Sequence, residues 1–318
     1  MKPRLVVVVG PTAAGKTAVG VALAERLGGE VISADAFAVY RRLDIGTAKP
    51  AAAVRARVRH HLVDVADPRE RYSAGTFLRD ADAAVTDIVA RARVPIVVGG
   101  THFYVRALLY GLFREPPKNV TLRAQLEHAW AEDPARLRAR LAELDPESYR
   151  RIAAGDRQRI LRALEVTLLA GRPMSELWRE EPCCKPRYPF RMFALSLPRE
   201  VLHARISQRV EAIFAAGLVQ EARSLLESGV PLHAHALKAI GYREACRVVA
   251  GEWSEAQARQ ATVVATRQLA KRQLTWLRGE RDVTWVGGDD PVAEIVAILE
   301  ASGGTGAGAE QDGDQCSG

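Results

Sequence analysis

Short apolar runs alternate with longer amphipathic stretches over the first hundred residues of the chain. Four such runs lie at 5–9, 30–33, 61–65 and 95–98, each separated from the next by residues with helical spacing. This alternation is typical of parallel strands joined by helices that pack on both faces of the sheet. The pattern therefore predicts an α/β fold.

The pattern changes at about residue 115, where strand signals disappear until 187. Two stretches, 122–144 and 156–169, place arginines among Leu, Ile and Ala at helical spacing, and Asp145 followed by Pro separates them. We interpret residues 115–187 as an inserted all-helical domain.

A strand pattern returns at 191–197, and Pro198 ends it. The segments expected after it are three long helical stretches, a short strand and a last helix: 200–217, 218–228, 255–276, 283–286 and 292–299. Ser254 is the expected N-cap of the longest helix. The predicted core domain is therefore discontinuous and covers residues 1–114 and 188–301.

Composition agrees with a large globular protein, since 48% of the 318 residues are hydrophobic. The formal net charge is +7, and the stretch 302–318 holds three acidic residues and no basic one, so residues 1–301 carry +10. That excess favours a polyanionic partner. The stretch 302–318, rich in Gly and acidic residues, is expected to be a disordered tail.

No segment near the N-terminus has the length of a signal peptide or a membrane span, because the apolar run 5–9 is too short. A cytoplasmic protein with no membrane association is therefore expected. Cys183 and Cys184 are adjacent, and Cys246 and Cys316 lie far from them, so neither a zinc spacing nor a disulfide framework is present.

The run Gly10-Pro-Thr-Ala-Ala-Gly-Lys16-Thr17 directly follows the first apolar segment and has the spacing G-x-x-x-x-G-K-T. In a strand, loop and helix of this kind, backbone N–H groups, the helix N-terminus and the Lys16 ammonium converge on phosphate oxygens. The Thr17 hydroxyl is expected to ligate Mg²⁺. The run predicts a phosphate compound as ligand and leaves the reaction open.

Two other segments are expected at the carboxyl ends of strands, where ligands of parallel sheets usually bind. Asp35 follows the second apolar run, and a carboxylate there could accept a proton from a nucleophile or simply cap a turn. A ribose-binding acid of a dinucleotide fold is disfavoured, because the loop is not G-x-G-x-x-G. The run Gly99-Gly100-Thr101 offers a hydroxyl, or is a simple turn. It lacks the aspartate that would help to hold Mg²⁺ in a kinase, which weakens that interpretation.

Basic residues recur late in the chain, where Arg267, Lys271 and Arg278 share a helical face with Trp276 beside them. Such a face is either solvated or suited to a nucleic-acid backbone. The pair His60-His61 is a weak metal candidate, because neighbouring strand residues point in opposite directions and no acidic cluster accompanies them.

Seven segments together resemble, in order and spacing, the family of tRNA dimethylallyltransferases, the bacterial tRNA isopentenyltransferases. They are GPTAAGKT, ISADAFAVYRRLDIGTAKP, HHLVDVADPRERYSAGTF, PIVVGGTHFYVRALLYGL, DRQRILRALEV, AIGYRE and TRQLAKRQLTWLR. The similarity runs from about Arg4 to Trp285. It implies a P-loop NTPase-like parallel sheet with helices on both faces and an inserted helical domain that binds tRNA.

The resemblance also implies a reaction, in which a dimethylallyl group passes from dimethylallyl diphosphate to N6 of an adenine adjacent to the anticodon. The products are N6-isopentenyladenosine and diphosphate, and no phosphoryl group moves. Asp35 would accept the N6 proton, and Thr101 would hydrogen-bond the bridging oxygen of the leaving diphosphate. The implied diphosphate-binding residues are Gly10, Pro11, Thr12, Ala13, Ala14, Gly15, Lys16, Thr17 and Arg223, with Thr17 holding the cofactor Mg²⁺.

The implied partner is the anticodon stem-loop of tRNA, whose adenine must leave the base stack to reach the site. The implied tRNA-binding residues are Ala36, Phe37, Ala38, Arg123, Gln158, Arg159, Ile160, Leu161, Arg162, Lys238, Gly241, Tyr242, Arg243, Lys271, Arg272, Gln273, Trp276 and Arg278. A monomer is expected.

The chain departs from the family at four positions close to the expected site. Ala36 and Ala38 stand where Ser and Gln are common, and His102-Phe103 stands where Gly or Met precedes Leu. Asp35 and Thr101 themselves are unchanged, so the resemblance leaves the reaction as expected and leaves open the detailed contacts to the flipped adenine. Three rival functions are an ATP-dependent small-molecule kinase, a prenyltransferase acting on AMP, and an RNA-binding protein without catalytic activity.

Overall fold

The computed structural model describes residues 4–113, 116–117, 119–180 and 185–303 and divides into two compact units. The core unit comprises Met1–Leu109 and Arg187–Gly318, and the helical unit comprises Tyr110–Pro186. The expected insertion, 115–187, therefore begins five residues after the structural unit and ends one residue after it. Cys183, Cys184, Cys316 and the segment 304–318 lie outside the described residues.

The core unit is built on a six-stranded parallel sheet in the order β3-β2-β4-β1-β5-β6. The strands are β1 (Leu5–Val9), β2 (Gly29–Ser33), β3 (His60–His61), β4 (Val94–Val98), β5 (Phe190–Leu195) and β6 (Val283–Val286). The strand β1 lies in the interior of the sheet, where Val7 is in register with Val97 of β4 and Met192 of β5. All residues of β1 are buried, as expected for a strand covered on both faces.

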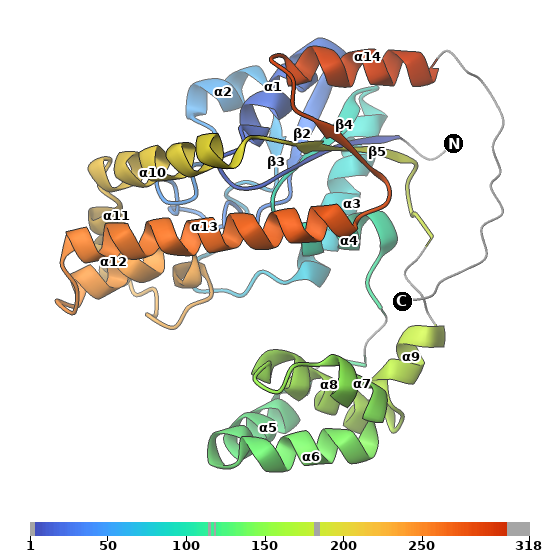
Figure 1. Ribbon diagram of the computed structural model, residues 1–318, viewed down its shortest axis with the longest axis vertical. Helices are drawn as coiled ribbons and strands as arrows, with labels where there is room; N and C mark the ends of the chain where they lie inside the picture. Colours follow the sequence, from blue (N-terminus) through green and yellow to red (C-terminus); the bar gives the residue numbers. More distant parts are fainter. Residues whose placement is uncertain (1–3, 114–115, 118, 181–184, 304–318) are drawn as a thin grey trace. The chain divides into compact units, whose positions relative to one another are not determined.

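Helices cover both faces of this sheet (Figure 1). On one face, α1 (Lys16–Leu27) and α14 (Pro291–Gly303) pack against alternate strand residues such as Val6 and Val8. On the other lie α3 (Ala74–Ala90) and α4 (His102–Tyr110). The predicted P-loop-like α/β fold is confirmed.

The remaining elements of the core unit are helical. They are α2 (Ala52–Arg57), α10 (Arg199–Ala215), α11 (Leu218–Glu227), the 3₁₀ helix η1 (Ala236–Lys238), α12 (Tyr242–Val249) and α13 (Glu255–Gly279). Ser254 caps α13 as predicted, since its hydroxyl accepts from the N–H of Gln257. Within the described part of the chain, no helix is both long and apolar enough to cross a bilayer.

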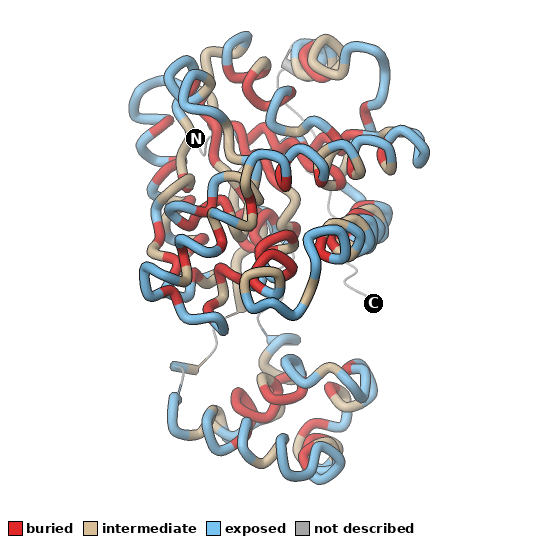
Figure 2. The backbone as a smooth tube through the Cα atoms, turned by 90° about the vertical axis from the view of Figure 1, so that its left-hand side faces the viewer, coloured by how far each residue is buried: buried red, intermediate tan, exposed pale blue. Residues whose placement is uncertain are grey.

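The helical unit has a core of its own, visible as buried segments in Figure 2. Its helices are α5 (Val120–Glu132), α6 (Pro134–Leu144), α7 (Pro146–Arg151), α8 (Arg157–Ala170) and α9 (Met174–Glu180). Leu141, Leu164 and Met174 pack together from three of these helices. Because this apolar cluster is contained within the insertion, the unit buries its hydrophobic surface without the sheet.

Two expected elements differ from the structure, each for a local reason. The strand expected at 61–65 ends after His61, because Leu62 and Asp64 have φ values of 62° and 60°, which extended backbone excludes. The helix expected at 122–144 is two helices, since the Asp133 carboxylate caps α6 and Pro134 occupies its first turn.

Candidate active site

The glycine loop between β1 and α1 forms an anion-binding site. Gly15 ends the loop at a φ of 90°, a left-handed conformation that favours glycine, and α1 begins at the next residue. The N–H groups of the first helical turn have no partners within the helix and are therefore available to a phosphate. The Lys16 ammonium donates one hydrogen bond to the carbonyl of Pro11 at 2.7 Å and retains two further donors.

Burial lowers the pKa of Lys16 to about 8, and the nearby Asp35 carboxylate opposes this effect. A desolvated ammonium of this kind gains more from an incoming anion than one in open water does. The electrostatics of the loop therefore agree with the predicted phosphate ligand.

A glycine brings the ends of β2 and β4 together next to this loop. A Cβ on Gly99 would lie 2.1 Å from the carbonyl oxygen of Ala34, so only glycine permits the approach. The N–H of Ala36 donates to Oγ1 of Thr101 at 3.0 Å, which leaves the Thr101 hydroxyl proton for a ligand.

The Asp35 carboxylate has two distinct oxygens. Its Oδ1 accepts from the N–H groups of Phe37 at 2.8 Å and Ala38 at 3.1 Å, so Asp35 does cap a turn. Its Oδ2 has no hydrogen-bond partner among the described residues and is available to a substrate proton. The turn thus holds the carboxylate in a fixed orientation.

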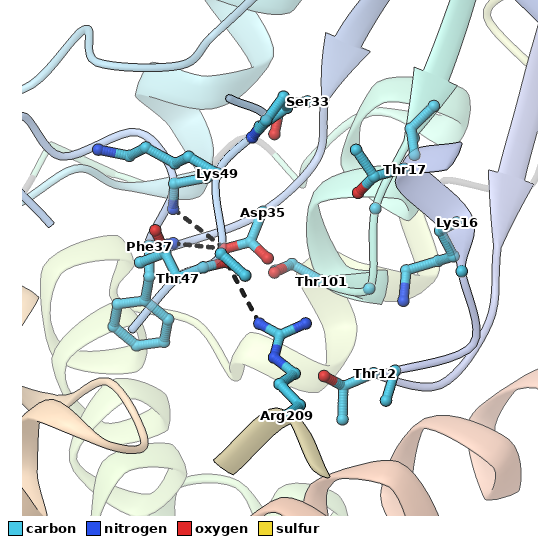
Figure 3. A pocket seen from close by; sticks show the side chains of 18 of the residues that line it. Thr12, Lys16, Thr17, Ser33, Asp35, Phe37, Thr47, Lys49, Thr101 and Arg209 are labelled. Atoms are coloured by element: carbon cyan, nitrogen blue, oxygen red, sulfur yellow. Dashed lines mark hydrogen bonds between the residues drawn. The ribbon is translucent and has the colours of Figure 1, made fainter. Parts of the chain in front are cut away.

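These groups share one cavity of about 840 Å³ (Figure 3). Its lining includes Lys16 and Thr17 of the glycine loop, Asp35, and Thr101. Figure 3 shows the Asp35 carboxylate, the Thr101 hydroxyl and the Lys16 ammonium directed into the same space. The segment Ala36, Phe37 and Ala38 also lines the cavity, and the Phe37 ring stacks on His235 with 5.7 Å between centroids.

The arginines of the cavity differ from the one expected. Arg223 on α11 is exposed and is not among the lining residues, whereas Arg205 and Arg209 of α10 line the cavity. Burial lowers the pKa of Arg209, and the Asp35 charge opposes this, which places the two groups within electrostatic reach. The four-residue spacing of Arg205 and Arg209 on one helical face was the available signal in the sequence.

Gln273 of α13 also has a different role from the expected tRNA contact. Its side chain is buried, with Oε1 accepting from the N–H of Thr12 and Nε2 donating to the carbonyl of Gly100, both at 2.8 Å. Gln273 therefore connects the glycine loop to the Thr101 loop. Nearby, Trp276 is half-buried and stacks on His102, with 4.1 Å between ring centroids and 10° between planes.

The other residues of the core unit expected to contact tRNA fall into two groups. Lys238, Arg243, Lys271, Arg272 and Arg278 are exposed. Gly241 and Tyr242 are buried, and Tyr242 has no exposed surface. A direct side-chain contact from Tyr242 to RNA is therefore contradicted.

The helical unit shows the same division. Gln158 and Arg159 are exposed at the start of α8, whereas Ile160 and Leu161 are fully buried in the core of the unit and present nothing to an RNA. Arg123 and Arg162 both form ion pairs with the buried Glu165, at 3.6 and 2.8 Å. The segment DRQRILRALEV on α8 thus contains both core and surface residues, because residues at helical spacing alternate between the two faces of the helix.

The residues of the cavity fit a magnesium ion that would be held mainly by the phosphate oxygens of a bound substrate. Thr17 is exposed at the start of α1 and lines the cavity, and Mg²⁺ prefers oxygen ligands, often phosphates and water. Among the described residues there is no group of three or more His, Cys, Asp or Glu side chains that could hold a metal by themselves. His61 is engaged by Glu30 at 2.7 Å, and Nδ1 of His60 is bonded to the carbonyl of Val58.

Comparisons with known proteins agree over most of the chain. Residues 38–280 match the model of the IPP transferase family, and residues 3–66 match that of isopentenyl transferases. The tRNA dimethylallyltransferase of Anaeromyxobacter sp. (strain Fw109-5) is 50% identical over 285 residues, which cover 89% of this chain and 94% of the relative. That of Xylella fastidiosa (strain M12) is 46% identical and covers 94% and 97%.

Solved structures give the same result. The tRNA isopentenylpyrophosphate transferase of Bacillus halodurans is 35% identical with a TM-score of 0.70, and covers 94% of this chain and 96% of the relative. The tRNA isopentenylpyrophosphate transferase of Staphylococcus epidermidis is 32% identical with a TM-score of 0.69, and covers 95% and 100%. The resemblance carried by the seven sequence segments is confirmed, and the chain belongs to the IPP transferase family.

Proposed function

We propose that this chain transfers the dimethylallyl group of dimethylallyl diphosphate to N6 of an adenine adjacent to the anticodon of tRNA. The relatives of known structure are named for tRNA prenylation, and the curated relatives for tRNA dimethylallyl transfer. The observation that carries the proposal is that one cavity is lined by both Lys16, which can bind an anion, and Asp35, which can accept a proton.

The reaction forms a bond between N6 of the adenine and C1 of the prenyl group, while the bond from C1 to the bridging oxygen breaks. The electron pair of that bond leaves with the diphosphate, and the N6 proton passes to Oδ2 of Asp35. An exocyclic amine is a poor nucleophile because its lone pair is delocalised, so a carboxylate that receives its proton lowers the barrier.

Negative charge develops on the leaving diphosphate, and the groups nearest to it are cationic or donate hydrogen bonds. Lys16, the N–H groups at the start of α1 and Arg209 stabilise the departing oxygens, and the Thr101 hydroxyl donates to the bridging oxygen. We assign the arginine role to Arg209, because Arg223 lies outside the cavity.

A bound Mg²⁺ would neutralise part of the diphosphate charge, with the Thr17 hydroxyl as its protein ligand. The exposed basic residues of α12 and α13, with Gln158 and Arg159 of the helical unit, supply charge for the anticodon stem-loop.

The test combines the purified protein, dimethylallyl diphosphate and Mg²⁺ with a tRNA whose anticodon loop carries adjacent adenines. We expect N6-isopentenyladenosine in digested tRNA by mass spectrometry, together with one diphosphate per product. Parallel reactions with AMP as the acceptor, and with ATP in place of the prenyl donor, test the rival functions. Absence of the modified nucleoside, or product from AMP alone, would overturn the proposal.

A further inference from the structure

We propose that Tyr242 is a positioning residue for the diphosphate site, acting through Glu221 and the segment Ile45–Thr47 on the guanidinium of Arg209. The inference builds on the proposed function, since it concerns how the leaving group is held. It gives a physical role to a tyrosine within the AIGYRE segment that cannot reach an RNA with its side chain.

The first contact in this chain joins Tyr242 to Glu221. The Tyr242 hydroxyl donates a short hydrogen bond to Oε1 of Glu221 and accepts the N–H of Gly46 at 3.1 Å. Burial and the Glu221 charge both raise the pKa of Tyr242 far above its ordinary value. The hydroxyl therefore keeps its proton at neutral pH and acts as a donor to Glu221.

The second contact fixes the backbone that follows β2. The Glu221 carboxylate accepts the N–H of Ile45 at 3.1 Å and that of Asp44 at 3.3 Å. The Tyr242 ring packs directly on Gly46, where a Cβ would lie 2.4 Å from Cε2 of the ring. Ring, hydroxyl and carboxylate thus hold three consecutive peptide groups in one position.

The third contact connects this backbone segment to Arg209 in the cavity. The carbonyl of Thr47 accepts a hydrogen bond from Nη2 of Arg209 at 3.3 Å, and this is the hydrogen bond that the structure gives to the guanidinium within the described residues (Figure 3). A displacement of the backbone at Thr47 would therefore displace the guanidinium, because no second hydrogen bond or ion pair among those residues restrains it.

Lys49, two residues after Thr47, restrains the same stretch from a different side. The Lys49 ammonium donates to the carbonyl of Tyr40 at 2.6 Å and pairs with Asp64 at 2.5 Å and Asp44 at 2.8 Å. The segment is therefore held from inside the core by Lys49 and from α11 and α12 by Glu221 and Tyr242. Loss of the Tyr242 hydroxyl would free the N–H of Gly46, the residue before Thr47, while the contacts of Lys49 and the hydrogen bond from the Thr47 hydroxyl to the carbonyl of Leu43 would stay in place.

The test compares Tyr242→Phe with Lys238→Ala, a change at an exposed residue a few positions earlier in the same region. Binding of inorganic diphosphate with Mg²⁺ and binding of tRNA are measured separately by calorimetry, with thermal unfolding as a control for stability. Tyr242→Phe should weaken diphosphate binding about fivefold to twentyfold and leave the tRNA dissociation constant within about twofold. Lys238→Ala should show the opposite pattern.

A double-mutant cycle with Arg209→Ala tests the route of the effect. If Tyr242 acts through Arg209, adding Tyr242→Phe to Arg209→Ala should weaken diphosphate binding no further. An additive loss, an unchanged affinity in Tyr242→Phe, or a parallel loss of tRNA binding would overturn the inference. If Tyr242→Phe does not fold, Glu221→Gln is measured in the same cycle with the same expectation. Failure of the wild-type protein to bind diphosphate would instead refute the proposed function.

Discussion

At the scale of single residues, the two carboxylate oxygens of Asp35 have different roles. The turn uses Oδ1, and the substrate is expected to use Oδ2. The substitution Asp35→Asn keeps an oxygen for the N–H groups of Phe37 and Ala38 and removes the proton acceptor. We expect the kcat to fall by about 10² to 10⁴ while tRNA affinity stays close to that of the wild type.

Asp35→Ala is the matched comparison, because it removes the turn contacts as well. It should lose at least as much turnover, with an additional loss of thermal stability. Single-turnover measurements with saturating tRNA would check both variants. Near wild-type turnover in Asp35→Asn would exclude the carboxylate as the base, and an equal loss of tRNA binding would make Asp35 a recognition residue.

A second prediction at this scale concerns the pH dependence that Lys16 imposes on the donor. Burial lowers its pKa to about 8 in the free protein, so the ammonium is charged below that pH and loses its proton above it. A bound diphosphate favours the charged form and raises the pKa again. Affinity for dimethylallyl diphosphate should therefore be constant below about pH 8 and fall by up to about tenfold per pH unit above it.

Titration calorimetry from neutral to alkaline pH would measure this profile. Lys16→Arg, whose guanidinium keeps its charge throughout the range, serves as the comparison and should give a flat profile at lower affinity. A wild-type profile as flat as that of the arginine variant would show that Lys16 does not titrate in this interval.

At the scale of elements, α13 contributes one buried polar side chain to the joint between two loops of the site. Gln273→Leu would leave the N–H of Thr12 and the carbonyl of Gly100 without their partner. We expect a loss of about 2 kcal/mol in stability and a rise of about tenfold in KM for dimethylallyl diphosphate. Gln268→Leu, at an exposed position of the same helix, should change neither quantity appreciably.

Steady-state kinetics and chemical denaturation would test the pair. A loss of stability in Gln273→Leu without any change in KM would make the bridge purely structural. An effect on tRNA binding alone would instead restore the expected contact between Gln273 and the RNA.

How far the sequence predicted these elements depended on whether their determinants are local. The glycine loop and the cap of α13 follow from neighbouring residues, and the structure has them as predicted. The short strand β3 ends at the left-handed backbone of Leu62 and Asp64, a conformation that is unusual for leucine and that the apolar pattern does not reveal. The break between α5 and α6 was readable, since Asp133 followed by Pro is a helix start.

The site was less predictable because its side chains come from distant elements. Asp35 and Thr101 follow strands, so their shared edge was predicted from sheet geometry. Arg209 reaches the cavity from α10, and only tertiary packing separates it from the exposed Arg223. The family segments identified Tyr242 and Gln273 as important but did not reveal that both face inward.

At the scale of the whole molecule, the distribution of exposed positive charge suits a large polyanionic partner. The net charge is +7, and exposed basic residues occur on α12 and α13 and, far from them in the sequence, on the helical unit. The partly buried cations of the cavity, Lys16 and Arg209, instead face the small anionic leaving group. Binding of tRNA and binding of diphosphate should therefore respond to different substitutions and to salt in different ways.

The double substitution Lys271→Ala with Arg272→Ala tests this separation, since both side chains are exposed on α13. Each phosphate contact contributes about 0.7 to 0.9 to the slope of log K against log salt concentration, so the loss of two contacts should flatten the slope by about 1.4 to 1.8. Arg26→Ala, on the exposed end of α1 across the sheet (Figure 1), is the control and should leave the slope unchanged. Fluorescence anisotropy with labelled anticodon stem-loops at several salt concentrations gives the slopes, and diphosphate affinity should stay constant in both variants. An unchanged slope in the double variant would remove this face of α13 from the RNA interface and leave the helical unit and α12 to supply the binding charge.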